Sequence, residues 1–331
     1  MIARHAKSPC CGSKIRRFGR RRRQCANCKK TWSIRPKKRG RPKRRTGLNV
    51  LKRALLSRYT LRQLAEQRGM LSAPTLRYRF RGALARFVKR PRNYKIPGGR
   101  LVLLADGMRF QFAGKPWVLY LTALKACAGA NALFLDPLLI PGREGATRWE
   151  QVFAVIPKRA HSRISGLAVD NLNGMREIAR RQHWVLQLCQ FHLIHKLQFH
   201  RRGQHRALKG GKVREQIYQL VRRALELPEG AELDGALASL RKRAAGDCGT
   251  RRMQAVVREF LACLEHYRAY RAHPSLGIPT TTNVMESMGG IIRDLFRRSR
   301  AANNPDSLLL WATALIRLHP QLVCNGRHST D

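Results

Sequence analysis

Three acidic residues, far apart in the sequence, are the first candidates for chemistry. Asp106 ends the apolar run LVLLAD, and Asp170 ends the apolar run ISGLAVD. Such runs are typical of strands that are buried on both faces, and ligands in open α/β sheets gather at the ends of strands. If the two strands are adjacent and parallel, the two carboxylates meet there, and their mutual repulsion requires a cation between them.

The third acid is Glu286, in the polar segment TTTNVMESMGG. We expect the threonines and Asn283 to cap a helix that carries Glu286 on its first turns, with Gly289 and Gly290 allowing close approach to DNA or to the sheet. Carboxylates offer only oxygen ligands, which select hard ions such as Mg²⁺ or Mn²⁺. Two such ions, about 3.5–4 Å apart, would flank an in-line displacement at phosphorus. The alternative is that each acid is structural, because helix N-termini attract acids.

Acidic residues are scarce in this chain of 331 residues, which has 67 Lys+Arg, 19 Asp+Glu and a formal net charge of +48. That charge opposes compaction and favours a polyanionic partner, for which nucleic acid is the leading candidate. No apolar run approaches the roughly 20 residues that span a bilayer, and the first residues lack the apolar core of a signal peptide. Nine cysteines, an odd number, fit free thiols in a reducing compartment. We therefore expect a cytoplasmic, nucleoid-associated protein without membrane contact.

The middle of the chain alternates strand-like and helix-like segments. We expect strands at residues 101–106, 115–126, 131–140, 164–170 and 184–189, with the first two forming an antiparallel hairpin. Helical segments are expected at 147–157, at 174–182, from 190 onward and across much of 211–270. This order predicts an α/β fold with a mixed sheet. Three further acids compete with the first set but fall beside proline, in a loop or in a helix: Asp136, Glu144 and Glu150.

Cysteines near the N-terminus suggest a metal site. Cys25 and Cys28 have the spacing of one knuckle of a zinc ribbon. The other knuckle would come from SPCCG, in which Ser8 takes the position of the first expected cysteine. The candidate zinc ligands are Cys11, Cys25 and Cys28, with Cys10 or His5 as the fourth. The alternative is a basic β-hairpin without metal, which the strand-prone segment KTWSI supports equally.

A strongly basic segment follows the cysteines. Residues 1–45 contain 19 Lys+Arg and no acid. Within them, KKRGRPKRR resembles an AT-hook, in which Gly40 and Pro42 keep the backbone extended and narrow. Arg39, Arg41 and Lys43 would then enter a narrow minor groove, whose negative potential attracts arginine. A disordered basic linker is the alternative.

Residues 48–92 have the spacing of three short helices. Thr60 is expected to cap the second helix, and Ser72 to open the third, with Pro74 in its first turn. This arrangement predicts a helix–turn–helix unit that would contact guanine edges or phosphates through residues of its last helix: Thr75, Arg77, Arg79 and Arg81. The alternative is a small helical bundle whose charges face water.

Four motifs occur in an order that resembles a known family. LADG, GLAVDN, CQFH and TTTNVMES together resemble the catalytic domain of Mutator-like DDE transposases and their bacterial insertion-sequence relatives, over roughly residues 100–318. Cys189 and His192 match the Cys-x-x-His motif of this family, and the segment from Asn283 to Glu286 matches the one that brings the last acid. Some bacterial members also carry a zinc ribbon and a helix–turn–helix unit in front.

The resemblance implies an RNase H-like catalytic domain over residues 100–200 and 279–318, interrupted by an all-α insertion at 201–278. A zinc-ribbon-like part (1–36), the AT-hook-like linker (37–47) and the helix–turn–helix unit (48–92) would precede it. Asp106, Asp170 and Glu286 would hold Mg²⁺ or Mn²⁺ for the cleavage of double-stranded DNA and for transfer of the freed 3′-hydroxyl.

The partners implied by the family are terminal inverted repeats, target DNA and further copies of the chain assembled on DNA. A catalytically inactive or domesticated copy that only binds DNA is the alternative. For Cys189 and His192, a role in the core or facing DNA is favoured over a zinc pair.

Overall fold

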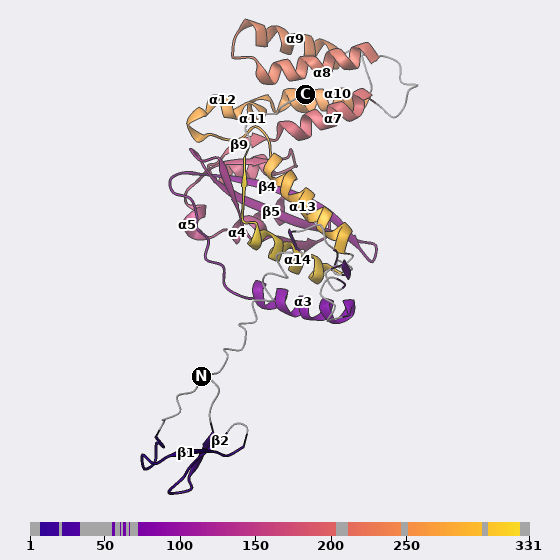
Figure 1. Cartoon of the computed structure of the whole chain (residues 1–331). Helices are drawn as coiled ribbons and strands as arrows, with labels where there is room; N and C mark the ends of the chain where they lie inside the picture. Colours follow the sequence, from indigo (N-terminus) through magenta and orange to yellow (C-terminus); the bar gives the residue numbers. More distant parts are fainter. Residues whose placement is uncertain are drawn as a thin grey trace. The chain divides into compact units, whose positions relative to one another are not determined.

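The computed structural model describes residues 7–19, 22–33, 72–202, 211–245, 251–299 and 304–324, together with six positions between 55 and 66 (Figure 1). The chain forms two compact units, Met1–Leu51 and Lys52–Asp331. The predicted AT-hook-like linker, with Arg39, Arg41 and Lys43, lies outside the described residues, as does His5.

The first unit contains a small antiparallel sheet. Its strands are β1 (Ile15–Arg17), β2 (Arg22–Cys25) and β3 (Thr31–Ser33), in the order β1-β2-β3. The predicted hairpin is therefore confirmed, and the strand-prone segment around Trp32 forms its third strand. The turn between β2 and β3 carries Cys28 back towards the residues that precede β1, because Cys25 N–H donates to Lys30 O at 2.9 Å and Ala26 N–H to Lys14 O at 2.9 Å.

The second unit is built on a mixed sheet, so the predicted α/β class is confirmed. Its hydrogen-bonded order is β10-β6-β5-β4-β8-β9, with β7 paired to β5. Pairs on the β5 side of β4 are antiparallel, whereas β4, β8 and β9 run parallel. The strands are β4 (Leu101–Phe112), β5 (Lys115–Ala126), β6 (Asn131–Phe134), β7 (Leu138–Pro141), β8 (Ile164–Val169), β9 (Val185–Leu188) and β10 (Gln321–Val323).

Two strand predictions need correction. The first strand does not end at Asp106 but continues to Phe112, since β5 supplies a hydrogen-bonded partner along the whole length of the hairpin. The segment 131–140 is not one strand but two, β6 and β7, separated at Asp136 and Pro137. Proline has no N–H to donate to a ladder, so the chain leaves the sheet there and pairs again with a different part of β5.

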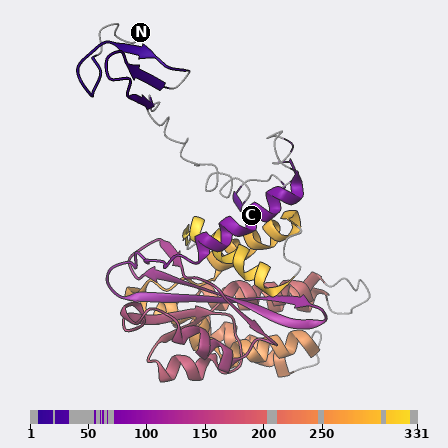
Figure 2. The same cartoon turned by 90° about the horizontal axis from the view of Figure 1, so that it is seen from below.

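Helices cover both faces of the sheet (Figure 2). Alternate residues of β4, such as Leu101 and Leu103, pack in the main core with Trp149 and Ile178, from α4 (Ala146–Ala154) and α6 (Met175–Arg181). A one-turn helix, α5 (Lys158–His161), precedes β8. On the other face, α13 (Asn283–Ser299) crosses β4 and β5, and α14 (Pro305–Leu318) lies beside α13. This arrangement places one carboxylate-bearing helix, α13, directly over β4.

The predicted helical periodicity between residues 211 and 270 is also confirmed. The helices there pack through buried aliphatic and aromatic side chains such as Val221, Leu240 and Phe260, and these belong to the same continuous core as the sheet. They are α7 (Gln190–Arg202), α8 (Gly211–Glu226), α9 (Ala231–Ala245), α10 (Arg251–Ala262), α11 (Leu264–Tyr267) and α12 (Ala269–Ala272), followed by a 3₁₀ turn at Pro274–Leu276. Of the helices in the described ranges, none has the length and apolar character needed to cross a membrane.

The third helix of the expected helix–turn–helix unit is α3 (Ala73–Val88), opened by Ser72 as predicted, with Ser72 Oγ accepting from Thr75 N–H at 3.5 Å. The Thr60 cap is confirmed as well, because Gln63 N–H donates to Thr60 Oγ1 at 3.2 Å. One side of α3 packs against α14, where Phe80 and Trp311 lie 5.1 Å apart. The predicted DNA-contacting residues Thr75, Arg79 and Arg81 are exposed, and Arg77 belongs to the same helix.

Candidate functional site

The two predicted aspartates lie at matching positions of neighbouring parallel strands. Leu104 of β4 pairs with Ala168 of β8. Asp106 and Asp170 each follow two residues after this pair, Asp106 after Leu104 and Asp170 after Ala168. Both carboxylates therefore leave the sheet on the same face. The condition set for a meeting of these carboxylates, adjacent and parallel strands, is therefore met, and adjacent strands are about 4.8 Å apart. The correction concerns β4 alone, which continues past the point where β8 ends.

Helix α13 brings the third acid to this place. Glu286 is on its first turn, and its N–H donates to Thr282 O at 3.1 Å. Ligand atoms of Asp106, His192 and Glu286 all lie within 4.8 Å of one another. Asp170 lies beside this cluster, with its Oδ1 4.0 Å from His192 Nδ1. The structure therefore brings Asp106 and Glu286 together, and connects Asp170 to them through His192.

His192 is the side chain on which the cluster centres. Its Nε2 is 2.9 Å from Glu286 Oε1. Its Nδ1 is buried without a hydrogen-bond partner among the described atoms. Sequence reasoning left the role of His192 open, and the position between the acids could not be foreseen because it depends on how α7 packs against α13.

Cys189 anchors the segment that leads into α13. Its sulfur is buried and accepts hydrogen bonds from Thr282 N–H at 3.3 Å and from Thr282 Oγ1 at 3.2 Å. The next residue adds a backbone link, since Gln190 N–H donates to Thr280 O at 2.9 Å. The hydroxyl of Thr282, expected in a helix cap, thus bonds to Cys189 instead. Cys189 is thus buried in the core, and its hydrogen bonds link the Cys-x-x-His motif to the residue before the helix that carries Glu286.

Gly289 faces the sheet and Gly290 does not. A Cβ at Gly289 would lie 3.4 Å from Met108 Sδ on β4, an ordinary van der Waals distance, whereas one at Gly290 would have no neighbour within 4 Å. The space around these positions therefore does not require glycine for α13 to approach the sheet. Asn283, the first residue of α13, is partly exposed beside the site.

The close approach of Asp106, His192 and Glu286 shifts the pKa of each of them. Burial, followed by repulsion from Glu286, raises the pKa of Asp106 to about 7. The hydrogen bond from His192 is the main cause that lowers the pKa of Glu286. Burial alone would lower the pKa of His192, but the neighbouring Cys189 and Glu286 outweigh it and raise this pKa to about 11. An imidazolium here partly balances acids that burial otherwise disfavours.

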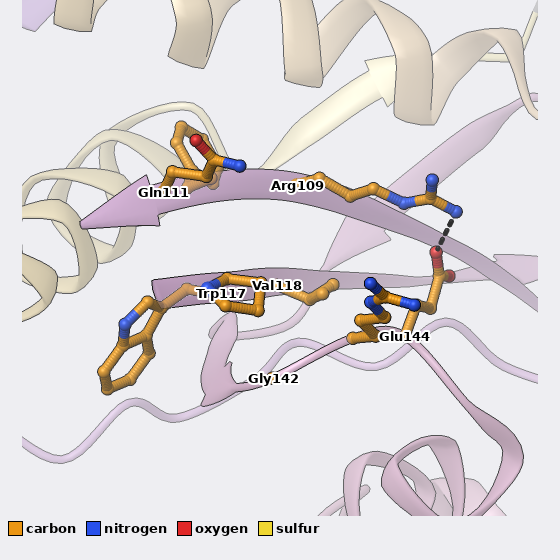
Figure 3. A pocket seen from close by; sticks show the side chains of 9 residues that line it. Arg109, Gln111, Trp117, Val118, Gly142 and Glu144 are labelled. Carbon is orange, nitrogen blue, oxygen red and sulfur yellow. Dashed lines mark ion pairs between the residues drawn. The ribbon is translucent and has the colours of Figure 1, made fainter. Parts of the chain in front are cut away.

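A fourth acid, Glu144, lies next to the site, although its place in a predicted loop argued against such a position. A Cβ at Gly107 would be 2.5 Å from Glu144 Oε1, so the carboxylate lies against the backbone that follows Asp106. Trp149 Nε1 donates to Glu144 Oε1 at 3.2 Å. Burial is the main cause that raises the pKa of Glu144, and the charge of Asp170 raises it further. The hydrogen bond from Trp149 and the charge of Arg109 (Figure 3) lower it in part. The glycine after Asp106 is the only local signal that could have pointed to a close neighbour there.

The other two competing acids are structural. Asp136 Oδ1 accepts from Arg92 NH1 at 2.8 Å, and its carboxylate also pairs with Arg317 of α14. Glu150 forms an ion pair with Arg181. Both therefore tie elements together, in contrast to the acids around His192.

Four cysteines of the first unit form a second candidate metal site. Sulfur–sulfur distances are 3.2 Å for Cys10–Cys28, 3.2 Å for Cys11–Cys25 and 3.9 Å for Cys10–Cys11. Thiolates about 2.3 Å from one tetrahedral zinc ion lie roughly 3.8 Å apart, so the cluster is compatible with a structural zinc site. Ser8, at the position of the missing cysteine, is buried beside these sulfurs, with its Oγ 3.3 Å from Cys25 Sγ. Cys10 joins the cluster as the fourth candidate ligand, and the alternative, His5, lies outside the described residues.

Comparison with known proteins adds no assignment, because no protein-family model matches the sequence and no curated protein matches it either.

Proposed function

We propose that this chain is a DNA transposase of the DDE type, which cleaves DNA at the ends of an insertion sequence and transfers the freed 3′-hydroxyl to target DNA. The observation that carries the proposal is the convergence of Asp106 and Glu286 on His192, with Asp170 in register beside them. The mixed sheet and the order of the four motifs are compatible with the RNase H-like fold that the resemblance implies.

The residues around His192 fit a divalent cation. Asp106 and Glu286 are close, and burial together with their mutual repulsion raises the pKa of Asp106 to about 7. A cation relieves such repulsion, and carboxylate oxygens are the ligands that Mg²⁺ and Mn²⁺ prefer. We therefore propose that Asp106, Asp170 and Glu286 hold Mg²⁺ or Mn²⁺. When bound, the ion would make water or a 3′-hydroxyl a stronger nucleophile and would stabilise the leaving oxygen.

The surrounding side chains would keep these acids in position. Cys189 fixes Thr282 immediately before α13, so that Glu286 is on a helix whose start cannot shift freely. His192 orients the Glu286 carboxylate through its Nε2 hydrogen bond. Because misplacement by about 1 Å is costly in catalysis, this rigid support favours an active site over a chance cluster of acids.

The remaining parts would supply DNA affinity. The net charge of +48 and the exposed Arg79 and Arg81 of α3 provide phosphate contacts. The cysteine cluster would stabilise a small basic unit through zinc. We propose that these parts recognise the terminal inverted repeats and that several copies of the chain assemble on them.

The test is cleavage of duplexes copied from the DNA that flanks the coding sequence, with Mg²⁺ or Mn²⁺ present. Asp106→Asn, Asp170→Asn and Glu286→Gln should each reduce strand cleavage to background while binding of the same duplex persists. Glu150→Gln is the matched control, because it also removes one acid, from an ion pair on α4. Full cleavage by any one of the three variants would reject that residue's role, and metal-independent cleavage would reject the proposal.

The second candidate is an inactive, transposase-derived protein that only binds DNA. Its supporting observation is that Glu286 is already engaged by His192 at 2.9 Å. The same assay separates the two functions, since this alternative expects duplex binding without cleavage in the unmodified chain.

A further inference from the structure

The small sheet of the first unit, β1-β2-β3 (Figure 1), has two faces of different character. Residues that pair across an antiparallel ladder project from the same face, and successive residues of a strand project from opposite faces. Arg16 pairs with Gln24, and Gln24 pairs with Thr31, so these three side chains form one row across the sheet. Phe18 and Arg22 continue the same face, because Phe18 N–H donates to Arg22 O at 3.1 Å and each is two residues from a member of that row. We call the surface of these five residues the outer face.

The opposite surface, the inner face, carries the metal cluster. Cys25 projects from it and is buried, with its sulfur 3.2 Å from Cys11 Sγ. Ile15, which pairs with Cys25, and Trp32 of β3 are partly covered on the same face. An antiparallel sheet commonly has one face packed on a core and the other in solvent. The inner face therefore serves the stability of the unit, and the outer face is left for another role.

The outer face offers groups that can recognise bases. Its exposed members are Arg16, Phe18, Arg22 and Thr31. Gln24 is at its centre, and its Nε2 donates to Lys29 O at 3.0 Å, which holds this side chain in place. In the major groove, arginine binds guanine edges, glutamine binds adenine edges, and phenylalanine contacts the methyl group of thymine. Half of the Phe18 side chain, 48%, remains in water, so its ring is available for such a contact.

Charge selects the class of partner. The first unit, Met1–Leu51, has 19 Lys+Arg and no Asp or Glu. No carboxylate side chain of this unit can therefore pair with the guanidinium groups of Arg16 and Arg22. A polyanion balances such a surface, and a nucleic acid gains affinity by releasing its counterions.

The width of the sheet selects the groove. Adjacent strands are about 4.8 Å apart, so the axes of three strands span about 10 Å. The major groove of B-DNA is about 12 Å wide and admits strands, whereas the minor groove is about 6 Å wide. The major groove of duplex RNA is deep and too narrow for side chains to read. The dimensions therefore favour duplex DNA and its major groove.

We propose that the outer face of the β1-β2-β3 sheet lies in the major groove of DNA and reads base sequence there. Arg16 and Gln24 contact base edges, Arg22 contacts a base edge or the adjacent phosphate, and Phe18 packs against the methyl group of a thymine. The inference deepens the proposed function, on which it rests for DNA as the partner. It assigns to a sheet a part of the sequence recognition that would otherwise fall to helix α3 alone.

The first measurement selects duplexes from a random pool with the unmodified full chain in its zinc-bound form. The selected duplex is then compared with a scrambled duplex of the same composition. Arg16→Ala should lower the ratio of the two affinities by roughly 5- to 150-fold, the discrimination that one good base contact gives. Arg17→Ala is the matched control, because it removes the same charge from the next position of β1, which projects from the inner face. It should leave this ratio unchanged, and equal ratios for the two variants would overturn the proposal.

The second measurement changes the DNA instead of the arginines. In the selected duplex, 7-deazaguanine removes the N7 acceptor and uracil removes the thymine methyl group, both in the major groove, whereas inosine removes the minor-groove amino group of guanine. The positions that Arg16→Ala affects should respond to the major-groove changes and tolerate inosine. Uracil should weaken binding at one thymine, and Phe18→Ala should abolish that difference. If the unmodified chain tolerates every major-groove change, the proposal is wrong whatever the variants do.

The outcomes separate this inference from the proposed function. If the unmodified chain cleaves its duplex but Arg16→Ala and Arg17→Ala behave alike, only the inference fails. If the chain selects a sequence through Arg16 and never cleaves it, the catalytic proposal fails and the inference stands. If the chain selects no sequence, or if duplex RNA of the selected sequence competes as well as the DNA, the outer face recognises charge alone and the inference fails.

Discussion

Replacing Asp106 by asparagine should stabilise the metal-free protein while abolishing its activity. Asp106 is buried, and burial together with repulsion from Glu286 raises its pKa from 3.8 to about 7. The folded state therefore binds this proton more tightly than the unfolded state does, and stability falls as pH rises between about 4 and 7. Asparagine keeps an acceptor for the Gly107 N–H, which now donates to Asp106 Oδ1 at 2.9 Å, and carries no charge.

The size of the effect follows from the two pKa values. Each pKa unit corresponds to about 1.4 kcal/mol. The raised pKa of Asp106 therefore costs the folded state up to about 4 kcal/mol above pH 7, about 2 kcal/mol at pH 5 and almost nothing at pH 3. The free energy of unfolding of Asp106→Asn should therefore exceed that of the unmodified protein by these amounts, whereas most substitutions lower it by about 1 kcal/mol. A saturating divalent cation should offset the same cost in the unmodified protein and should have little effect on the variant.

Urea unfolding of both proteins at pH 5 and pH 8, in buffer that was freed of divalent cations beforehand and contains no chelator, measures the difference. Asp136→Asn is the control of opposite sign. Burial would raise the pKa of Asp136, but hydrogen bonds from Arg317 and Arg92 outweigh this and lower it. That carboxylate stabilises the fold above pH 4 and loses its effect as pH falls, so its loss should cost roughly 1.5–3 kcal/mol at pH 8. An Asp106→Asn protein that is no more stable at pH 8 than at pH 5, relative to the unmodified chain, would refute the reasoning.

Three further outcomes are expected. Cys189→Ala removes the acceptor of both Thr282 hydrogen bonds, so the free energy of unfolding should fall by about 1–3 kcal/mol in urea and strand cleavage should fall further, because Glu286 loses its support. Gly107→Ala pushes the end of the flexible Glu144 side chain away from β4 and breaks its hydrogen bond with Trp149, so the free energy of unfolding should fall by about 1 kcal/mol, whereas Gly290→Ala, which has open space, should be neutral or slightly stabilising. Removing zinc with a strong chelator should make residues 7–33 sensitive to protease while the second unit keeps its melting temperature, since the cysteine cluster lies wholly within the first unit; an unchanged digestion pattern would argue against a zinc site.

The sequence was sufficient to identify the parts of the sheet that carry the acids. Apolar runs bounded by acids predicted the strands that contain Asp106 and Asp170. Their parallel pairing was only a condition of the metal-site prediction, and the structure supplies it. The extension of β4 to Phe112 also has a local signal in the sequence, because Met108, Phe110 and Phe112 alternate with polar residues. That alternation is typical of a half-exposed strand, and Phe110 does pack against Phe296 of α13, with ring centroids 6.0 Å apart.

The composition of the cluster could not be predicted in the same way. Glu144 is in a loop, where no periodicity indicates which way a side chain points, and its position depends on contacts with Gly107 and Trp149. His192 was identified as part of a motif, but its place between the acids depends on the packing of α7 against the start of α13. Local patterns fix which residues belong to one element, while contacts between elements decide which of them meet.

The strongest physical reason to regard these acids as a functional site is that acids are scarce in this chain and that arginine is abundant. Arginine and lysine far outnumber acids in this chain, and the structural acids use arginine: Asp136 binds two arginines, and Glu229 pairs with the buried Arg268. In the part of the chain that the structure describes, Asp106 has no ion pair with arginine or lysine, and the ion-pair partner of Glu286 is His192. Leaving two nearby carboxylates without arginine, in a protein that has arginine to spare, raises the pKa of Asp106 and destabilises the folded state. Such costs cluster at functional sites, and the absence of a guanidinium group from these acids is what the proposed cation site expects.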